Sequence, residues 1–72
     1  RDPKSLLQEW VQSQGFGPPI YNTVSSSGPE HNKIFEVEVI VTGKPYGRGR
    51  GRSKQAAAKA AARQALRVFN LD

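Results

Sequence analysis

A chain of 72 residues is long enough for one domain only, and a domain of this size buries about 60% of the surface that its unfolded chain exposes. The absence of cysteine excludes disulfide bonds and cysteine-ligated zinc sites, and it fits a reducing compartment. No apolar run approaches the roughly 20 residues that a membrane-spanning helix needs. Because the sequence begins at Arg1 and contains no methionine, we expect it to be a piece of a longer protein.

The formal net charge of +5 is unevenly distributed along the chain. Residues 1–41 carry three basic and five acidic side chains, whereas residues 44–67 carry eight basic side chains and no acidic one. This asymmetry is typical of a surface that binds a polyanion, and it favours nucleic acid as the partner. A solvated basic face that serves solubility and an anionic membrane surface are the two alternatives.

The first predicted element is a helix within the segment DPKSLLQEWVQSQGFG. Asp2 is suited to cap this helix, and Pro3 is suited to its first turn. Apolar side chains recur at spacings of three and four residues and form one face of the helix: Leu6, Leu7, Trp10 and Val11. Gly15 and the Gly-Pro-Pro sequence at residues 17–19 end the helix.

Two strands are predicted in the middle of the chain. IYNTVS at residues 20–25 indicates a short strand, and SSGPEHNK at residues 26–33 indicates a loop, because glycine, proline and asparagine favour turns. IFEVEVIV at residues 34–41 gives the clearest strand signal, since its apolar residues alternate with Glu36 and Glu38. The two glutamates therefore lie on the opposite face of the strand from the valines.

A turn predicted for TGKP at residues 42–45 leads into a third strand, YGRGRGR at residues 46–52. Its two-residue period places glycines on one face, Gly47, Gly49 and Gly51, and arginines on the other, Arg48, Arg50 and Arg52. Glycine at alternate positions ordinarily weakens a strand, so we expect this face to meet another backbone closely. An arginine-glycine segment without fixed structure is the alternative, which the helix signal directly after it disfavours.

A second helix is predicted from the N-cap Ser53 to about Asn70, since the alanine-rich segment 56–62 has high helix propensity. Its expected buried side consists of Ala57, Ala61, Ala65, Leu66 and Phe69. The order of elements indicates an α+β domain of the form α-β-β-β-α, with a three-stranded antiparallel sheet and both helices on one face. The glycine face of the third strand and the alanine face of this helix would let the two backbones approach closely.

The start of the second helix is a candidate anion site. Ser53 and Lys54 follow the glycine-rich strand without a loop, so the free N–H groups and positive dipole end of the helix lie beside the sheet. The segment does not match nucleotide-binding motifs. Residues 51–54 read Gly-Arg-Ser-Lys instead of the Gly-Lys-Ser/Thr of a P-loop, and the glycines fall two residues apart instead of following GxGxxG.

Two further candidates lie in the first half of the chain. Gln8 and Gln12 share one polar face of the first helix, with Ser5 and Glu9 close to it. Glutamine can both donate and accept hydrogen bonds there, to hydroxyls or base edges, although an ordinary solvated face is the alternative. The single histidine, His31, is either an exposed contact residue or a loop residue without a role. We expect no metal site and no catalytic residues.

Taken in order, these motifs resemble those of double-stranded RNA-binding domains. SLLQEWVQ, the pair Pro19 and Tyr21, GPEH, FEVEV and GRGRGRSKQAAAKAAARQAL occur in the order of that family, and they cover essentially the whole chain, residues 1–72. Within the family, DPKSLLQEW, GPEH and GRGRGRSKQAAAKAAA are most similar to the C-terminal domain of bacterial ribonuclease III. The resemblance implies the same order of one helix, three antiparallel strands and a second helix.

The resemblance also implies a mode of RNA binding. The first helix would lie in one minor groove and meet 2′-hydroxyls and base edges through Ser5, Gln8, Glu9 and Gln12. His31 would enter the next minor groove. Phosphates across the intervening major groove would meet the start of the second helix and its neighbours: Arg52, Ser53, Lys54, Gln55 and Lys59.

The sequence departs from the family in its phosphate-binding cluster. The family usually carries lysines at the positions of Lys54, Gln55 and Ala58, and only Lys54 remains here. Lys59 lies next to the vacant position, about 100° further around the helix. The arginines of the third strand are candidates to compensate, and the sequence leaves open which of them contact RNA: Arg48, Arg50 and Arg52.

The resemblance leads us to expect a module that binds double-stranded RNA by its A-form shape, with little sequence specificity. It would serve a ribonuclease III that processes structured RNA, including ribosomal RNA. The chain itself would be no enzyme and need no cofactor, whereas cleavage and magnesium would belong to a catalytic domain of the parent protein.

The same resemblance gives expectations about assembly and location. We expect a monomeric isolated domain, a homodimeric parent, a cytoplasmic location and no membrane partner. A protein-interaction or dimerisation module on the same fold is the alternative, which an exposed apolar face of the first helix would favour.

Overall fold

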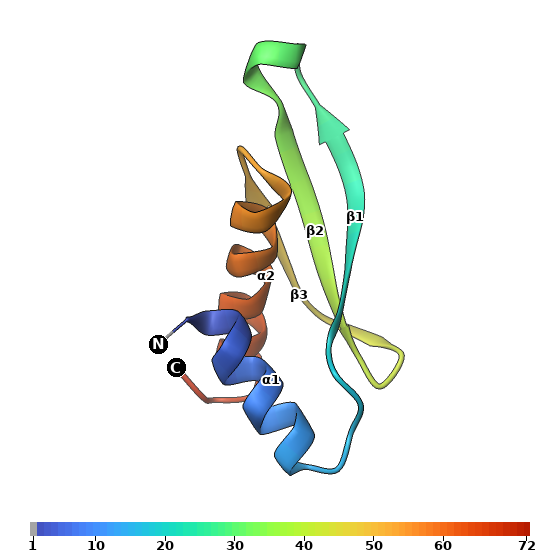
Figure 1. The fold of residues 1–72 in the computed structure, drawn as a ribbon, viewed down its shortest axis with the longest axis vertical. Helices are drawn as coiled ribbons and strands as arrows, with labels where there is room; N and C mark the ends of the chain where they lie inside the picture. Colours follow the sequence, from blue (N-terminus) through green and yellow to red (C-terminus); the bar gives the residue numbers. More distant parts are fainter. Residues whose placement is uncertain (1) are drawn as a thin grey trace.

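The computed structural model describes residues 2–72 and has the predicted order of elements (Figure 1). The elements are α1 (Pro3–Ser13), β1 (Ile20–Ser27), the 3₁₀ helix η1 (Glu30–Asn32), β2 (Ile34–Val41), β3 (Lys44–Gly51) and α2 (Lys54–Val68). The three strands form one antiparallel sheet in the order β1-β2-β3. Both helices lie on the same side of this sheet, which confirms the predicted α+β architecture.

Two strands are longer than the sequence predicts. Ser26 and Ser27 belong to β1, because they pair with the first residues of β2 and this pairing outweighs the weak strand propensity of serine. Strand β3 begins at Lys44, because Thr42 (φ 52°) and Gly43 (φ 80°) alone make the turn. Two residues with positive φ form the tight hairpin connection that matches the twist of antiparallel strands.

Both helices begin with a side-chain cap, as predicted. The Asp2 carboxylate accepts a hydrogen bond from the Ser5 N–H at 3.0 Å, and the Ser53 hydroxyl accepts one from the Ala56 N–H at 3.0 Å. Helix α2 ends at Val68, two residues before the predicted end, because Asn70 adopts a left-handed conformation (φ 59°). The Leu71 N–H then returns to the Leu66 carbonyl at 2.7 Å and closes the helix end.

The hydrophobic core lies between the helices and the sheet. Its buried members are Leu7, Val11, Val37, Val39, Val41, Ala57, Ala58, Ala61, Ala62, Ala65 and Leu66. Phe69 packs at its edge, with its ring centroid 4.5 Å from that of Trp10 and 4.7 Å from that of Tyr46, so that it joins α1, α2 and β3. Leu6 and Trp10 also pack against the core, so all four apolar residues of α1 contact it.

Helix α2 and strand β3 meet backbone to backbone, as the glycine and alanine pattern predicts. A Cβ atom added at Gly49 would lie 2.5 Å from the Ala57 carbonyl oxygen, and one at Gly51 would lie 2.7 Å from the Ala57 nitrogen. Real Cβ atoms essentially never come within 3.0 Å of such atoms. The glycine face of β3 therefore exists to admit α2, and the first turn of α2 is fixed beside the end of β3.

Candidate nucleic-acid interface

The exposed first turn of α2 offers donors and positive charge to an anion. The Ser53 hydroxyl satisfies the Ala56 N–H, and the Ser53 carbonyl accepts the first helical hydrogen bond from the Ala57 N–H at 3.0 Å. The N–H groups of Lys54 and Gln55 have no partner within the helix, and the helix dipole adds partial positive charge to them. Both side chains are exposed.

A pocket of about 250 Å³ lies between the start of α2 and the start of α1. It is lined by Lys4, Tyr21, Thr23, Val37, Lys54, Gln55 and Ala58. The Lys4 ammonium lies 4.6 Å from the centroid of the Tyr21 ring, and the Lys54 ammonium lies 5.9 Å from that of Phe35. Two cations from different helices therefore line one pocket, which favours an anion between them.

Lys4 is a candidate that sequence reasoning missed. Its helical spacing of four from Gln8 is the signal that could have placed it on the same side of α1 as the glutamines. The structure adds that Lys4 shares the pocket with Gln55 and Ala58, the two positions where the family usually carries lysine. Lys4 of α1 thus brings a positive charge to the pocket beside the two α2 positions that lack the family's lysines.

The Tyr21 hydroxyl is the one buried side-chain polar atom within residues 2–72 that has no hydrogen-bond partner. Burial, with a smaller contribution from the negative charge of Asp2, raises the pKa of Tyr21 to about 12. The hydroxyl is therefore protonated at neutral pH and can donate a hydrogen bond. Tyr21 lines the pocket beside the two lysines, while its hydroxyl oxygen is itself buried.

The predicted face of α1 is exposed along its length: Ser5, Gln8, Glu9 and Gln12. The Ser5 hydroxyl donates a hydrogen bond to Asp2 Oδ2 at 2.8 Å, which leaves its oxygen lone pairs as acceptors. Glu9 also lines a second pocket of about 360 Å³, formed with Leu6, Trp10, Ser13, Leu66 and Leu71. The structure therefore brings the four predicted residues to one exposed helix surface.

Lys59 lies on the α1 side of α2. Hydrogen bonds from the Ser5 hydroxyl and then from its backbone N–H lower the pKa of the Asp2 carboxyl, and the charge of Lys59 contributes to the same shift. Lys59 is exposed, and its positive charge acts on the carboxylate that caps α1. Arg52 is exposed directly before the Ser53 cap and has no ion-pair partner among residues 2–72.

His31 lies far from α1, at the opposite end of the molecule. It is exposed in η1, which caps the β1–β2 hairpin, while the start of α2 lies between η1 and α1 along the long axis (Figure 1). The described chain measures 41 × 24 × 15 Å along its principal axes, so the molecule is elongated in this direction. The structure thus separates the candidates into three groups in a row.

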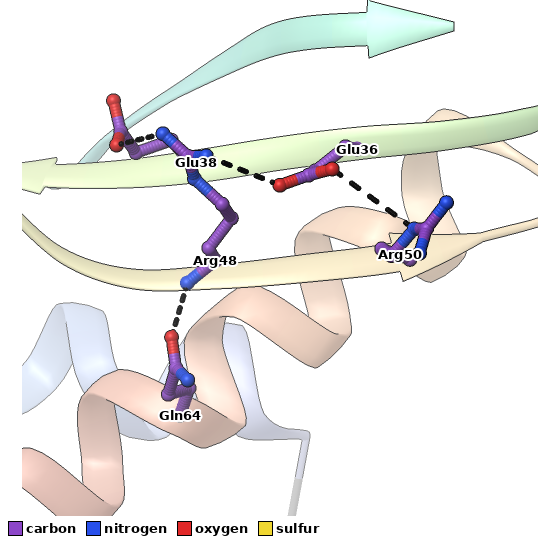
Figure 2. Close-up of polar contacts among 5 residues, drawn as sticks. All are labelled: Glu36, Glu38, Arg48, Arg50 and Gln64. Carbon is purple, nitrogen blue, oxygen red and sulfur yellow. Dashed lines mark hydrogen bonds and ion pairs between the residues drawn. The ribbon is translucent and has the colours of Figure 1, made fainter. Parts of the chain in front are cut away.

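In the observed conformation, Arg48 and Arg50 are paired with glutamates and do not lie with the other cations at the start of α2. Both side chains project from the helix-free face of the sheet toward Glu36 and Glu38, as Figure 2 shows. Arg48 contacts both glutamates, at 3.3 and 3.0 Å, and Arg50 lies 3.9 Å from Glu36. Two-residue alternation, which puts the glycines against α2, necessarily turns these arginines away from it.

Comparison with known proteins identifies the family. The family described as "Double-stranded RNA binding motif" matches residues 3–68. Ribonuclease 3 of Phenylobacterium zucineum is 56% identical over 62 residues, which are 86% of this chain and 26% of that protein. Ribonuclease 3 of Caulobacter vibrioides is 48% identical over 66 residues, 92% of this chain and 29% of that protein. The chain therefore spans between a quarter and a third of the length of these relatives.

Solved structures give the same family. A structure of Arabidopsis HYL1 superposes with a TM-score of 0.85 and 35% identity, covering 97% of this chain and 99% of that one. A variant of the dsRBD of human tRNA dihydrouridine synthase (20) gives a TM-score of 0.81 and 32% identity, covering 100% of this chain and 74% of that one. The chain belongs to the double-stranded RNA binding motif family, and it is a double-stranded RNA-binding domain.

Proposed function

We propose that this domain holds A-form RNA along its long axis, with three groups of contacts. Ser5, Gln8, Glu9 and Gln12 of α1 meet one minor groove, and His31 meets the next. The start of α2, with Arg52, Ser53, Lys54, Gln55 and Lys59, meets the phosphates between them. The observation that carries the proposal is the order of the three exposed groups along the molecule, which follows the minor–major–minor groove sequence of duplex RNA.

The pocket between the helices refines this proposal. Lys4 and Lys54 line it from different helices, so each brings one positive charge to the same pocket. A phosphate of the RNA backbone meets both lysines there. Lys4 then takes the role of the lysine that is missing at Ala58.

We further propose that the domain is the substrate-binding module of a ribonuclease III that processes structured RNA, such as ribosomal RNA. The identity of about half with two ribonuclease 3 proteins supports this parentage. Cleavage, its magnesium and homodimerisation would then belong to the remainder of the parent, in the cytoplasm, and the isolated domain would be a monomer. None of the helices within residues 2–72 is long and apolar enough to cross a membrane.

The test is binding of the 72-residue chain to duplexes of about 20 base pairs, made as RNA and as DNA of one sequence, at two salt concentrations. We expect tighter binding to RNA, because only RNA offers 2′-hydroxyls to α1, and a steep loss of affinity with salt. Equal and weak binding to both duplexes would contradict the proposal and leave a generic polyanion surface.

Two variants test the assigned phosphate contacts. Lys54→Ala and Lys4→Ala should each lower the slope of log affinity against log salt by about 0.9, equally for all duplex RNAs. Lys44→Ala is the matched control, since it removes the same charge from the exposed start of β3, away from the pocket. A slope that falls as much for Lys44→Ala as for the other two would remove the pocket from the interface.

A further inference from the structure

The helix-free face of the sheet carries a closed network of two glutamates and two arginines (Figure 2). Arg48 Nη1 lies 3.3 Å from Glu36 Oε2, and Arg48 Nη2 lies 3.0 Å from Glu38 Oε2. Arg50 Nε lies 3.9 Å from Glu36 Oε1. The four side chains sum to zero charge, although β3 alone presents two arginines on this face.

The register of the sheet fixes this network. Glu38 is the cross-strand partner of Arg48, and Glu36 is that of Arg50. The Arg48 backbone is held from the other side as well, because its N–H donates to Gln64 Oε1 of α2 at 2.5 Å. Opposite charges directly across two antiparallel strands attract, so the pairing is built into the strand alignment.

The glutamates are better shielded from solvent than the arginines. The Glu36 and Glu38 side chains are 23% and 20% exposed, whereas those of Arg48 and Arg50 are 54% and 68% exposed. The hydrogen bond and the charge of Glu38 raise the pKa of Arg48, with a smaller contribution from Glu36. Arginine is a cation at neutral pH in any environment, and Arg48 is already paired with carboxylates that a phosphate would have to displace.

Without the glutamates, this face would be a second site for nucleic acid. Arginines two residues apart on an exposed strand bind phosphate backbones through charge, whatever the sugar or sequence. Helices α1 and α2 lie on the opposite face of the sheet, and His31 lies in η1 at the end of the β1–β2 hairpin, so the groups assigned to RNA lie elsewhere. Binding at this face would therefore recruit DNA and RNA alike.

We propose that Glu36 and Glu38 are specificity-determining residues that neutralise Arg48 and Arg50 and so confine nucleic acid to the helix face. This inference rests on the proposed function, because it assumes that the helix face is where duplex RNA is selected. In this role, the four side chains prevent nucleic acid from binding at the helix-free face, and they make no contact with the duplex RNA bound at the helix face.

The test variant is Glu36→Gln with Glu38→Gln, which keeps the shape of both side chains and raises the net charge from +5 to +7. Binding to duplex DNA and duplex RNA of about 20 base pairs is measured against salt. We expect DNA binding to strengthen, with a slope steeper by about 1–2 from two new phosphate contacts. The preference for RNA over DNA falls accordingly.

Two control variants separate the local effect from net charge. Adding Arg48→Gln and Arg50→Gln to the double variant restores the net charge of +5, and DNA binding should return to the wild-type level. Glu30→Gln with Asp72→Asn also gives +7, but it breaks two exposed ion pairs, Glu30 with Lys33 and Asp72 with Arg67. Lys33 follows η1 and Arg67 lies near the end of α2, so they do not form two adjacent cations on one strand as Arg48 and Arg50 do, and the gain in DNA binding should be smaller.

A separate measurement holds even if the glutamine variants fold poorly. Arg48→Gln with Arg50→Gln in the wild-type background should leave the salt slope of RNA binding unchanged, because neither arginine contacts RNA. A lower salt slope in this variant would overturn the inference. Equal DNA binding by the two +7 variants would also overturn it, as would unchanged DNA binding by the variant with Glu36→Gln and Glu38→Gln. Failure of the wild-type chain to prefer RNA would instead overturn the proposed function, which the same titrations report separately.

Discussion

Helices α1 and α2 lie on the same face of the sheet, yet different kinds of contact hold them there. Helix α2 meets β3 through alanines and glycines, so that the backbones themselves touch, as Gly49 and Ala57 show. Helix α1 is anchored by large side chains, chiefly the fully buried Leu7 and Val11. A backbone contact tolerates no added atom, whereas a contact between side chains can repack. Helix α2, whose start is proposed to meet phosphates, is thus the more strictly placed of the two.

The largest effect is expected from Gly49→Ala. The new Cβ would meet backbone atoms of α2, which cannot rotate away as a side chain could, so helix and strand must separate. We expect a loss of about 3 kcal/mol or more in the free energy of unfolding, measured by chemical denaturation. Gly17→Ala is the control, because a Cβ at Gly17 meets nothing within 4 Å and should change stability little. Wild-type stability of Gly49→Ala would refute the backbone contact.

Leu7→Ala tests the other kind of anchoring. Leu7 is 0% exposed, so truncation removes buried apolar surface and leaves a cavity. We expect a loss of about 2–3 kcal/mol, in the lower part of the usual range, because the partly buried Leu6 and Trp10 can move toward the space. Ile20→Ala, at a position that is 59% exposed, should stay within about 0.5 kcal/mol. If Leu7→Ala cost more than Gly49→Ala, the comparison of the two helices would be reversed.

Ser53 allows stability and binding at the start of α2 to be separated. Ser53→Ala removes the cap on the Ala56 N–H and should cost about 1 kcal/mol of stability. Ser53→Asp keeps a capping oxygen and preserves stability, but its carboxylate occupies the place proposed for a phosphate and should weaken RNA binding. Thermal unfolding and RNA titration of both variants give the two readouts. An Asp variant that binds RNA like the wild type would exclude this helix end from the interface.

The sequence was sufficient for the parts of the fold that depend on local pattern. The caps at Asp2 and Ser53, and the alternation of β2, are properties of neighbouring residues, so they could be predicted. The two-residue turn could not, because Thr42 gives no sign that it adopts positive φ. The glycine face of β3 could be assigned to α2 because strand and helix are consecutive and both carry small residues.

The candidate site was predicted less completely, since its charges depend on placement across elements. Lys4 became a candidate only when the structure put it over Tyr21 of β1. The pairing of Arg48 with Glu38 depends on the register between β2 and β3, which the charge count along the chain does not contain. Counting eight cations in the second half of the chain therefore did not reveal that two of them are paired with glutamates.

The smallest effect is expected from Tyr21→Phe, at the pocket where the starts of α1 and α2 meet. Because burial raises the pKa of Tyr21 from 10.0 to about 12, its contribution to stability is complete below pH 10 and is lost as the pH rises through 12. At neutral pH, removing this unpartnered buried hydroxyl should raise the free energy of unfolding by less than about 1 kcal/mol. At alkaline pH, the variant should no longer show the loss of stability that ionisation of Tyr21 causes. Chemical denaturation at neutral pH and near pH 11 measures both, with Tyr46→Phe as the control.

If Tyr21→Phe also weakens RNA binding without changing the salt slope, the hydroxyl donates to RNA as a neutral group, and the pocket joins the two helices into one phosphate site. Unchanged RNA affinity would leave the two lysines as separate contacts.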